Sequence, residues 1–415
     1  MYSHRIPLIS AFGPDTAERL DKVVTGREED LCANDVSDRS HEIRERIRGS
    51  RILVVGGAGS VGAATLRLII SYLPAAVDVV DLDENGLAEL VRDLRGQPDG
   101  LPVDDIRFLP IDYGSPLMHR LLRVTGPYDL VVNFAAIKHV RSEKDELSLL
   151  HMLDTNLIKH RRFRTWLREH GNPARYFAVS TDKAANPSSM MGASKRLMED
   201  VIFDGSAGRN TTSARFANVA FSNGSLLQSW LIRLSKGQPM VAPRETRRYF
   251  VTLREAGEIC LLAACCAPDQ HVAVPRLDPA KHLRRLEDLA AEVCTFFGFE
   301  PAIFTDENEA RHSVPRELAR GCYPILLTPL DTSGEKPYEE FVAAGETVTE
   351  IGMRSLLAVR HAAPRYDLCG LLDEIERLVM DSSPTIRKED LVARFEAALG
   401  HFRHVETGRN LDQRL

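Results

Sequence analysis

Short apolar runs alternate with longer amphipathic stretches over residues 51–225. The runs RILVVGG, VDVVDLD, IRFLPID, DLVVNFAA, RYFAVST and TSARFANVA have the length and apolar content of strands, and the first indicates a strand buried on both faces. Stretches between them, such as AATLRLIISYL and MGASKRLMED, have helical spacing. Strands that alternate with helices predict an α/β fold, in which helices cover both faces of a doubly wound parallel sheet.

The pattern changes on either side of this region. Residues 1–50 are polar and charged, and we expect a helical N-terminal extension that packs on the main domain. Over 226–345 the alternation loosens, with a helical REAGEICLLAACCA and a strand-like HVAVPRL, which indicates a smaller subdomain. Residues 346–415 are expected to form a helical C-terminal tail. The segment 51–225 would then be the main domain.

Composition and charge argue against a nucleic-acid-binding, membrane-spanning or secreted protein. The chain has 415 residues, of which 44% are hydrophobic, and a net charge of −6, so charge gives no argument for a nucleic-acid partner. No apolar run reaches the roughly 18 to 20 residues of a membrane helix, and the N-terminus is a poor signal peptide. The seven cysteines are odd in number and lack a CxxC pair. We expect a cytoplasmic protein with free thiols, no membrane insertion and no metal site.

The first strand ends in the glycine loop VVGGAGSVG, which places Gly56, Gly59 and Gly62 between a strand and a helix. Glycine allows a tight turn and a close approach of the backbone to a pyrophosphate at the helix N-terminus. Asp81 closes the next strand about 20 residues on, where a carboxylate binds the adenosine ribose hydroxyls and disfavours NADP, with Asp83 as the alternative. The loop therefore predicts bound NAD.

Two further strand ends supply candidates. PIDY, after the third strand, offers Asp112 and Tyr113 at the adenine edge. NFAAIKHV (133–140), after the fourth, places Lys138 and His139 on the nicotinamide side, because ligands of a doubly wound sheet lie at the carboxyl ends of its strands.

The stretch STDKAANPSSMMGASKR follows the fifth strand. It places Thr181, Asp182 and Lys183 at the strand end, and then Met191 and Lys195 one turn apart on a helix. This helix resembles the Tyr-x-x-x-Lys helix of short-chain dehydrogenases, with methionine at the tyrosine position. Lys195 is predicted to hold the nicotinamide ribose. Methionine cannot transfer a proton, so either this is an inactive dehydrogenase or the acid and base lie elsewhere.

Together the motifs VVGGAGSVG, AAIKHV, STDKAANP, MGASKRLMED, ARFANVAFSNGS, RRYF and SGEKPYEEF resemble the CapD-like polysaccharide-biosynthesis group of extended short-chain dehydrogenases. The resemblance covers roughly residues 50 to 345 and is strongest to the UDP-N-acetylglucosamine 4,6-dehydratases, a subgroup of which has methionine at the tyrosine position. It implies that 51–225 is an NAD-binding Rossmann domain and that 226–345 is a nucleotide-sugar-binding subdomain that contributes strands to the main sheet. It also implies a UDP-sugar substrate, recycled NAD and a homo-oligomer. It also implies a member without the membrane-anchored N-terminal region of the family's long members.

The resemblance further implies a redox-neutral elimination. NAD takes hydride from C4 of the hexose, the C5 proton and the C6 hydroxyl leave as water, and hydride returns to C6. At the matching positions Asp182 is the acid at O6, Lys183 is the base at C5 and Thr181 holds the substrate hydroxyl. The acceptor of the O4 proton is left open between ionised Asp182 and a water relayed through Thr181.

The site residues fall into two predicted groups. Those that bind the cofactor are Gly56, Gly59, Ser60, Val61, Gly62, Asp81, Asp112, Tyr113, Ala135, Ala136 and Lys195. Those that bind the substrate are Lys138, His139, Asn218, Ser225, Arg248, Glu335 and Lys336.

Three alternatives stay open: a nucleotide-sugar epimerase, a C5-inverting dehydratase and a non-catalytic NAD-binding regulator. An epimerase would normally keep the tyrosine, and a regulator would be expected to lose several active-site polar residues together. The chain departs from the family pattern near the sugar pocket, where Asn133 replaces the commoner histidine and Arg141 the usual proline. The reaction type is therefore better specified than the hexose.

Overall fold

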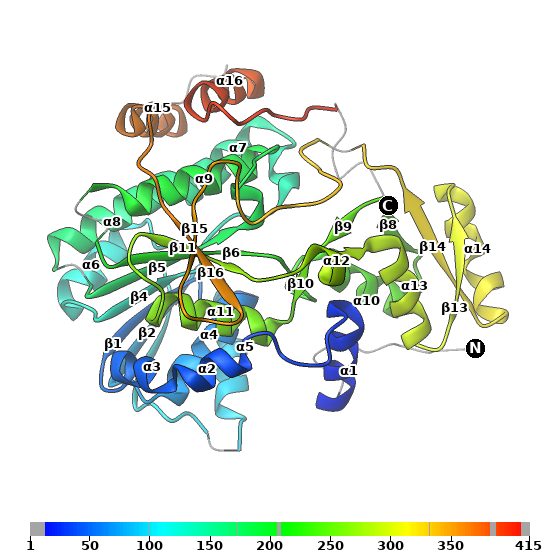
Figure 1. Cartoon of the computed structure of the whole chain (residues 1–415), viewed down its shortest axis with the longest axis horizontal. Helices are drawn as coiled ribbons and strands as arrows, with labels where there is room; N and C mark the ends of the chain where they lie inside the picture. The colour runs from blue at the N-terminus through cyan, green and yellow to red at the C-terminus, as the bar shows by residue number, and fades with distance from the viewer. Residues whose placement is uncertain are drawn as a thin grey trace.

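The centre of the structure is a nine-stranded sheet (Figure 1). The computed structural model describes residues 13–98, 100–171, 173–205, 209–331, 333–381 and 387–407. The strand order is β15-β16-β11-β6-β5-β4-β1-β2-β3, and each pair from β11 to β3 is parallel. The strands are β1 (Arg51–Val55), β2 (Ala76–Asp81), β3 (Asp105–Pro110), β4 (Leu130–Asn133), β5 (Arg175–Thr181), β6 (Thr211–Phe216), β11 (His271–Pro275), β15 (Val348–Glu350) and β16 (Leu356–Arg360). The predicted α/β class is confirmed.

Helices cover both faces because successive side chains of a strand point to opposite faces. In β1, Ile52 and Val54 join the core on one face, whereas Leu53 and Val55 join the core on the other. The first face carries α2 (Ala33–Asp38), α3 (Ser40–Ile47), α4 (Ser60–Ser71), α5 (Glu84–Arg95) and α11 (Leu253–Cys265), and the second carries α6 (Pro116–Thr125), α7 (Glu146–Leu153), α8 (Lys159–Glu169) and α9 (Met190–Phe203) (Figure 1).

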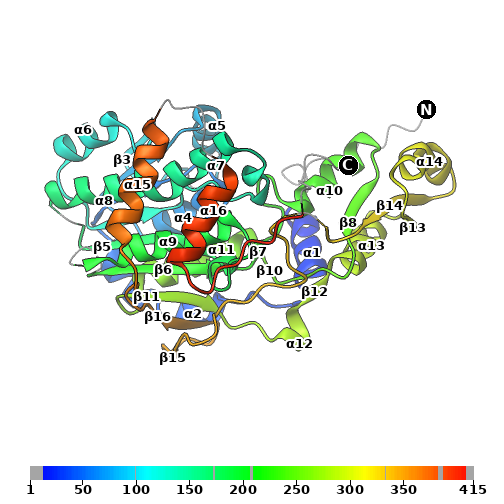
Figure 2. The same cartoon turned by 90° about the horizontal axis from the view of Figure 1, so that it is seen from above.

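A smaller subdomain lies beside the sheet (Figures 1 and 2). Its own three-stranded parallel sheet has the order β13-β14-β8. The buried Trp230 is central to its core, which Leu20 and Val24 of the N-terminal extension join. The elements are α1 (Pro14–Thr25), β7 (Asn218–Val219), α10 (Leu226–Lys236), β8 (Met240–Pro243), β9 (Arg247–Arg248), β10 (Phe250–Val251), α12 (Pro279–His282), β12 (Arg284–Arg285), α13 (Leu286–Phe296), β13 (Glu300–Phe304), α14 (Glu307–Ala319) and β14 (Cys322–Thr328).

The N-terminal extension is helical, as expected, from Pro14 onward, and residues 1–12 lie outside the described residues. It does not pack on the main domain alone. Helices α2 and α3 contact α11 of the main domain, whereas α1 packs on α13 of the subdomain. The reason is the spacing of Leu20 and Val24, which places two apolar side chains on one face of α1 and buries them in the subdomain core.

The C-terminal segment departs from the prediction of a helical tail that begins at residue 346. Its first part forms β15 and β16, and β16 pairs antiparallel with β11. The run LLAVR is too short for periodicity to separate a strand from a helix, and pairing with the open edge of β11 decides the outcome. Helices α15 (Leu368–Met380) and α16 (Lys388–Ala398) follow, and residues 408–415 lie outside the described residues. No described helix is both long enough and apolar enough to cross a membrane.

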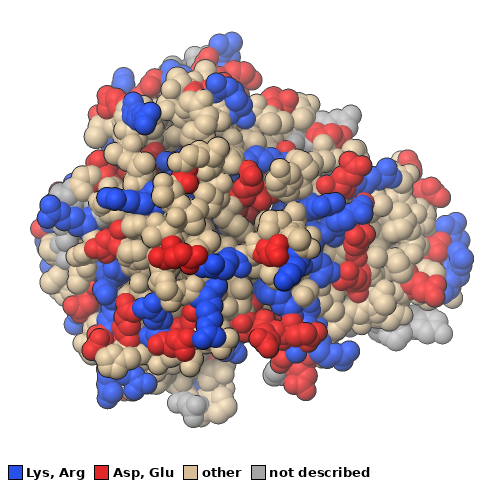
Figure 3. Space-filling view, in the orientation of Figure 1, with Lys and Arg blue, Asp and Glu red and all other residues tan. Residues whose placement is uncertain are grey.

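The strand order reverses its direction of growth between β1 and β4. At such a switch point the loops after two neighbouring strands diverge and leave a crevice at the carboxyl ends of the strands. The glycine loop follows β1 and the NFAAIKHV loop follows β4, so the fold brings these two predicted motifs to the crevice. On the face in Figure 3, acidic and basic side chains are interspersed.

Candidate active site

The glycine loop joins β1 to α4 and lies against the loop that follows β4. Gly56 has a φ of +76°, and a Cβ on it would lie 2.7 Å from the backbone nitrogen of Ala135. A Cβ on Gly62 would overlap the carbonyl oxygen of Gly56, so the first helical turn packs directly on the loop. Gly59 is the N-cap residue and α4 begins at Ser60. A close-packed loop that leads into a helix N-terminus has the form of a pyrophosphate site.

Asp81 lies at the end of β2 beside this loop. Its Oδ2 accepts a hydrogen bond from the N–H of Ala58 over 2.9 Å, and its Oδ1 accepts one from the N–H of Asp83 over 3.0 Å. Asp83 itself caps α5, where its side chain accepts from the N–H of Gly86. Because the Asp83 side chain already accepts the capping hydrogen bond of α5, Asp81 is the better candidate of the two for binding ribose hydroxyls.

The two residues predicted at the adenine edge lie in different surroundings. Asp112 accepts from the N–H of Gly114 over 2.9 Å and pairs with the ammonium of Lys159 over 2.5 Å. Tyr113 is 4% exposed, donates its hydroxyl to the carbonyl of Thr155 and packs edge-on against the core. Asp112 therefore lies near the surface, whereas the Tyr113 ring belongs to the core.

Asn133 organises the start of the loop after β4. Its Oδ1 accepts from the N–H of Ala135 over 2.9 Å, and its Nδ2 donates to the Tyr176 hydroxyl over 3.2 Å. These bonds fix Ala135, and with it the adjacent Ala136, where the chain turns past the glycine loop. The departure from the family's usual histidine thus has a local role in the fold.

Asn156, which the sequence did not single out, clamps the same loop. Its side-chain amide accepts from the N–H of Ile137 over 2.9 Å and donates to the Ile137 carbonyl over 3.0 Å. It also donates to the Ser194 hydroxyl over 3.0 Å, which ties the loop to α9. Asn156 lies in a π-helical segment (Asp154–Ile158), a conformation frequent at functional sites.

A short 3-10 turn (Asp182–Ala184) follows β5 and carries the predicted acid and base. Oδ1 of Asp182 accepts three hydrogen bonds: from the Thr181 hydroxyl over 2.9 Å, from the N–H of Lys183 over 2.8 Å and from the Lys183 ammonium over 3.0 Å. A Cβ on Gly192 would lie 2.6 Å from the carbonyl oxygen of Lys183, so α9 starts directly against this turn. Asp182 is buried, and Lys183 is partly exposed.

A third carboxyl group, Glu339, lies beside this pair. Oε1 of Glu339 is 3.8 Å from Nζ of Lys183, and Oε2 is 3.7 Å from Nζ of Lys336. Burial raises the pKa of Glu339, and the positive charge of Lys183 opposes that rise only in part. Glu339 is part of SGEKPYEEF, but nothing in the sequence distinguishes it from its neighbour Glu340. The distinction comes from the fold, which buries Glu339 and leaves Glu340 exposed.

Other charged residues with predicted roles, from this motif and from RRYF, lie close to the segment that carries Glu339. Lys336 donates to the carbonyl of Asn186, which lies in the loop after the Asp182–Ala184 turn. Arg248 donates through Nη1 to the carbonyl of Pro337 over 3.2 Å. Glu335 is partly exposed next to Lys336. The structure therefore brings Arg248 and Lys336, predicted as substrate-binding residues, to the segment that carries Glu339.

Met191 and Lys195 lie one turn apart on α9, as predicted. Met191 is 2% exposed, and its backbone N–H donates to Oε1 of Glu143 over 2.8 Å. The Lys195 ammonium donates to the carbonyl of Val179 over 2.6 Å, and burial lowers the pKa of Lys195 to about 8. A lysine held at the end of β5 is close to the crevice in which a nicotinamide ribose would lie.

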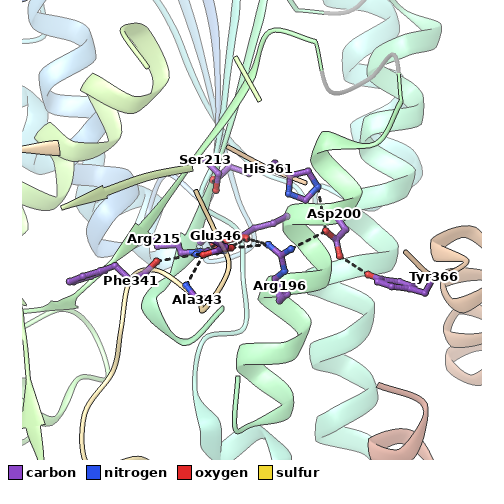
Figure 4. Close-up of polar contacts among 12 residues, drawn as sticks. Arg196, Asp200, Ser213, Arg215, Phe341, Ala343, Glu346, His361 and Tyr366 are labelled. Atoms are coloured by element: carbon purple, nitrogen blue, oxygen red, sulfur yellow. Dashed lines mark hydrogen bonds and ion pairs between the residues drawn. The ribbon is translucent and has the colours of Figure 1, made fainter. Parts of the chain in front are cut away.

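A buried ion-pair network joins α9 to β6 and to the segment after Glu339 (Figure 4). The Arg215 guanidinium donates to both oxygens of Glu199, over 2.9 and 2.7 Å, and to both oxygens of Glu346, over 2.6 and 2.8 Å. Ser180 donates to Glu199 over 2.6 Å. Burial alone would raise the pKa of Glu199, but Arg215 lowers it to about 2. Such a fully paired network fixes the relative position of three segments.

The network continues to the C-terminal segment through Asp200 (Figure 4). Oδ2 of Asp200 accepts from the Tyr366 hydroxyl over 2.5 Å, and Oδ1 lies 3.4 Å from Nε2 of His361. Burial raises the pKa of Asp200 to about 6 and lowers the pKa of His361 to about 4. The chain between β16 and α15 is thereby anchored on α9.

The predicted substrate residues Lys138 and His139 lie on the loop after β4. The Lys138 side chain reaches solvent, although the surrounding protein displaces enough water from its ammonium to lower the pKa. The His139 ring packs against Gly224, on which a Cβ would lie 2.8 Å from ring Nε2. Gly224 has a φ of +75°, so glycine is favoured there for both conformation and space.

Asn218 and Ser225 flank the loop that approaches the cofactor region from the other side. Asn218 begins β7, and Ser225 caps α10, accepting from the N–H of Gln228 over 3.2 Å. Between them, the N–H of Asn223 donates to the hydroxyl of Ser60 over 2.9 Å. This bond connects the predicted nucleotide-sugar segment directly to the start of α4.

The described residues contain one group of His, Cys, Asp or Glu side chains near enough to share an ion, formed by His119, Glu169 and His170. It lies on α6 and at the end of α8. All seven cysteines are unpaired, as the sequence suggested.

The chain matches a known protein family and several curated proteins. The sequence model of the family described as polysaccharide biosynthesis protein matches residues 52–361. The chain is 28% identical over 290 residues to the capsular polysaccharide biosynthesis protein CapD of Staphylococcus aureus, a match that covers 66% of this chain and 47% of CapD. It is 26% identical over 222 residues to a UDP-N-acetylglucosamine 4,6-dehydratase (inverting) of Campylobacter jejuni, which covers 51% of this chain and 63% of the relative. The chain thus spans about half the length of CapD.

Solved structures show the same fold. Pen from Bacillus thuringiensis matches with a TM-score of 0.60 at 20% identity, over 86% of this chain and 98% of Pen. DesIV, a dTDP-glucose 4,6-dehydratase of Streptomyces venezuelae solved with NAD, matches with a TM-score of 0.53 at 18% identity, over 71% of this chain and 88% of DesIV. The fold is that of the extended short-chain dehydrogenases, as predicted.

Proposed function

Because the chain belongs to the polysaccharide biosynthesis protein family, we propose that it is an NAD-dependent nucleotide-sugar 4,6-dehydratase that acts on UDP-N-acetylglucosamine. The observation that carries this proposal is the Thr181–Asp182–Lys183 turn, in which hydroxyl, carboxylate and ammonium are joined by hydrogen bonds at the end of β5. An acid and a base side by side suit the removal of water from two neighbouring carbon atoms. The named activity of the Campylobacter jejuni relative supports the choice of sugar.

The geometry of the switch point fits NAD. Gly56 and Gly62 leave no room for a Cβ, which is the condition for a backbone that approaches a pyrophosphate closely. Asp81 is held where ribose hydroxyls would be bound, and Lys195 is held at the end of β5. Bound NAD would supply reversible hydride transfer, from C4 of the hexose at the start and to C6 at the end.

We assign the O4 proton to Asp182. Its Oδ1 accepts three hydrogen bonds, and one of the three donors is the Thr181 hydroxyl. The proton that leaves O4 as C4 is oxidised can pass through Thr181 to Asp182. Asp182 then donates that proton to O6, the C6–O6 bond breaks and water leaves. One carboxyl group thus serves as base in the first step and as acid in the second.

Lys183 has to be neutral to remove the C5 proton. Two carboxyl groups flank its ammonium, and the raised pKa of Glu339 favours transfer of a proton to that group. We assign to Glu339 the proton that leaves Lys183 before elimination. Lys183 takes the C5 proton, its ammonium exchanges hydrogen with solvent, and it then protonates C5 once hydride has reached C6, so the protein regains its starting protonation state.

A C5-inverting dehydratase is the second candidate, because the Campylobacter jejuni relative is named as inverting. Inversion requires the new C5 proton to arrive on the face opposite to the one from which it left. The two outcomes share every step up to the elimination and differ only in the configuration of the product at C5.

Incubation of the protein with UDP-N-acetylglucosamine in deuterated water, followed by NMR, tests the proposal. We expect a UDP-4-keto-6-deoxy sugar with deuterium at C5 and no net change in NADH, and the coupling constants of the product report retention or inversion. A sugar that stays unchanged in the presence of bound NAD would contradict the choice of this substrate.

A further inference from the structure

Residues 402–407, which we term the C-terminal strap, lie beyond the family segment 52–361 and touch three loops of the candidate site. The strap leaves α16 and runs along the surface toward the smaller subdomain, as the red trace shows in Figures 1 and 2. The family motifs give no reason to expect this segment near the site. Val405 contacts two of these loops, and His404 contacts the third.

Val405 bridges two of these loops through its backbone. Its N–H donates to the carbonyl of Ser188 over 3.0 Å, and its carbonyl accepts from the N–H of Gly334 over 2.8 Å. Ser188 ends the loop that begins with the catalytic turn, and Gly334 precedes the Glu335–Lys336 pair. The Ser188 hydroxyl also donates to the Gly334 carbonyl over 3.1 Å. The strap therefore holds the catalytic loop and the SGEK loop together.

His404 reaches the third loop. Its Nε2 lies 3.0 Å from Oε2 of Glu143, and both side chains are 3% exposed. The other oxygen of Glu143 accepts from the N–H of Met191 over 2.8 Å. Glu143 ends the loop that carries Lys138 and His139, so one buried carboxylate joins the strap, the sugar-side loop and the residue at the tyrosine position.

The strap is itself fixed to a rigid element. Phe402 is fully buried in the core that includes Met191. The N–H of His404 donates to Oε1 of Glu396 in α16 over 3.0 Å, and Lys388 of α16 pairs with Glu406 over 2.6 Å. A segment anchored in this way can restrain the loops that it contacts, because a buried hydrogen bond is costly to leave unmade.

We propose that the C-terminal strap is part of the active site and that Glu143 and His404 form a positioning pair for the sugar half of the substrate. The pair sets the loop at 138–143 against the first turn of α9, in a site that has methionine at the tyrosine position. The inference rests on the proposed function in one respect, namely that a nucleotide sugar occupies this site. It concerns positioning only, since neither residue is asked to transfer a proton.

Hydrogen exchange of the protein without substrate tests the restraint directly. In His404→Ala we expect faster exchange in peptides that cover 138–145 and 186–192, including the Met191 N–H, and unchanged exchange in the glycine loop. His404→Gln keeps a donor for Glu143 and should restore slow exchange. His401→Ala, an exposed histidine three residues upstream, is the matched control. Unchanged exchange in His404→Ala, or a rise that includes the glycine loop, would overturn the proposal.

Kinetics then separates positioning from folding. We expect His404→Ala to lower kcat/KM for UDP-N-acetylglucosamine by roughly 10- to 100-fold, while the affinity for NAD is unchanged and His404→Gln recovers most of the loss. Equal loss in the alanine and glutamine variants, or wild-type kcat/KM in both, would count against the pair. Wild-type protein that does not turn over this sugar would count against the proposed substrate instead, and the exchange measurement would still decide the fate of the strap.

Discussion

Thr181 and Asp182 are joined by a 2.9 Å hydrogen bond in which the Thr181 hydroxyl donates to Oδ1 of Asp182. The same oxygen also accepts a hydrogen bond from the ammonium of Lys183. A threonine alone is a poor base, but a threonine that donates to a buried carboxylate can pass on a proton that it receives. The bond therefore links the group that would hold the O4 hydroxyl to the group that would later protonate O6.

Thr181→Val should slow oxidation at C4, because valine keeps the shape of the side chain and removes the proton path. We expect kcat to fall by about 10²- to 10⁴-fold, in the range of lost general acid–base catalysis. The kinetic isotope effect of a substrate deuterated at C4 should rise, since that step becomes limiting. Thr295→Val, at a surface position on α13, is the control. Wild-type kcat in Thr181→Val would exclude the relay.

Lys183→Ala should block elimination and leave NAD binding nearly intact, because Lys183 follows β5 rather than β1, which carries the glycine loop, and acts only on C5. The measurement is deuterium incorporation at C5 in deuterated water, together with NAD affinity by fluorescence. Lys236→Ala, on the exposed end of α10, controls for loss of a surface charge. Normal turnover in Lys183→Ala would remove this residue from the mechanism.

Glu339→Gln should leave Lys183 without its proton acceptor. Burial raises the pKa of Glu339, which favours transfer of a proton to this carboxyl group, whereas glutamine cannot accept a proton. We expect the acid limb of the pH profile of kcat to move to higher pH, with partial recovery of activity above neutrality. Glu340→Gln is the matched control, because Glu340 is exposed and bonds to Asn186. Identical pH profiles for the two variants would contradict the assignment.

Lys195→Met should stabilise the protein at neutral pH. Burial lowers the pKa of Lys195 from 10.5 to about 8, so keeping it charged in the fold costs stability below pH 8, and this cost disappears as the pH rises from 8 to 10.5. Near pH 7 we expect the variant to exceed wild type by about 2–3 kcal/mol in free energy of unfolding, with the gap closing toward pH 10.5. Denaturant unfolding at several pH values checks this, and a gap that is independent of pH would contradict it.

Much of the fold was predictable because its signals are local. Each strand of the Rossmann domain is a short apolar run that ends in glycine or in polar residues, and the glycine loop, Asp81 and Lys195 follow from their spacing to those runs. β16 was not predictable, because the run LLAVR suits either a strand or a helix and only its partner β11 decides. The position of α1 likewise depended on a core that the sequence could not place.

The residues that the sequence missed share a physical feature: they reach the site from distant segments. Asn156 acts on Ile137, Glu339 faces Lys183, and His404 meets Glu143 across 261 positions of the chain. In the sequence each looks like an ordinary polar residue. Its role becomes visible only when the fold buries it and brings a partner from a distant segment to its side chain. Local patterns can identify the turn that carries Asp182 and Lys183, but the groups that set its protonation and position emerge only from the tertiary structure.

The most direct test of the central claim follows the hydrogen on C4. UDP-N-acetylglucosamine that carries deuterium at C4 is converted by the protein with its own NAD, and the product is examined by NMR and mass spectrometry. A dehydratase that works through the Thr181–Asp182–Lys183 turn places that deuterium in the C6 methyl group of a 4-keto-6-deoxy sugar. Deuterium that stays at C4, with or without inversion there, or that is lost to solvent, would contradict the account.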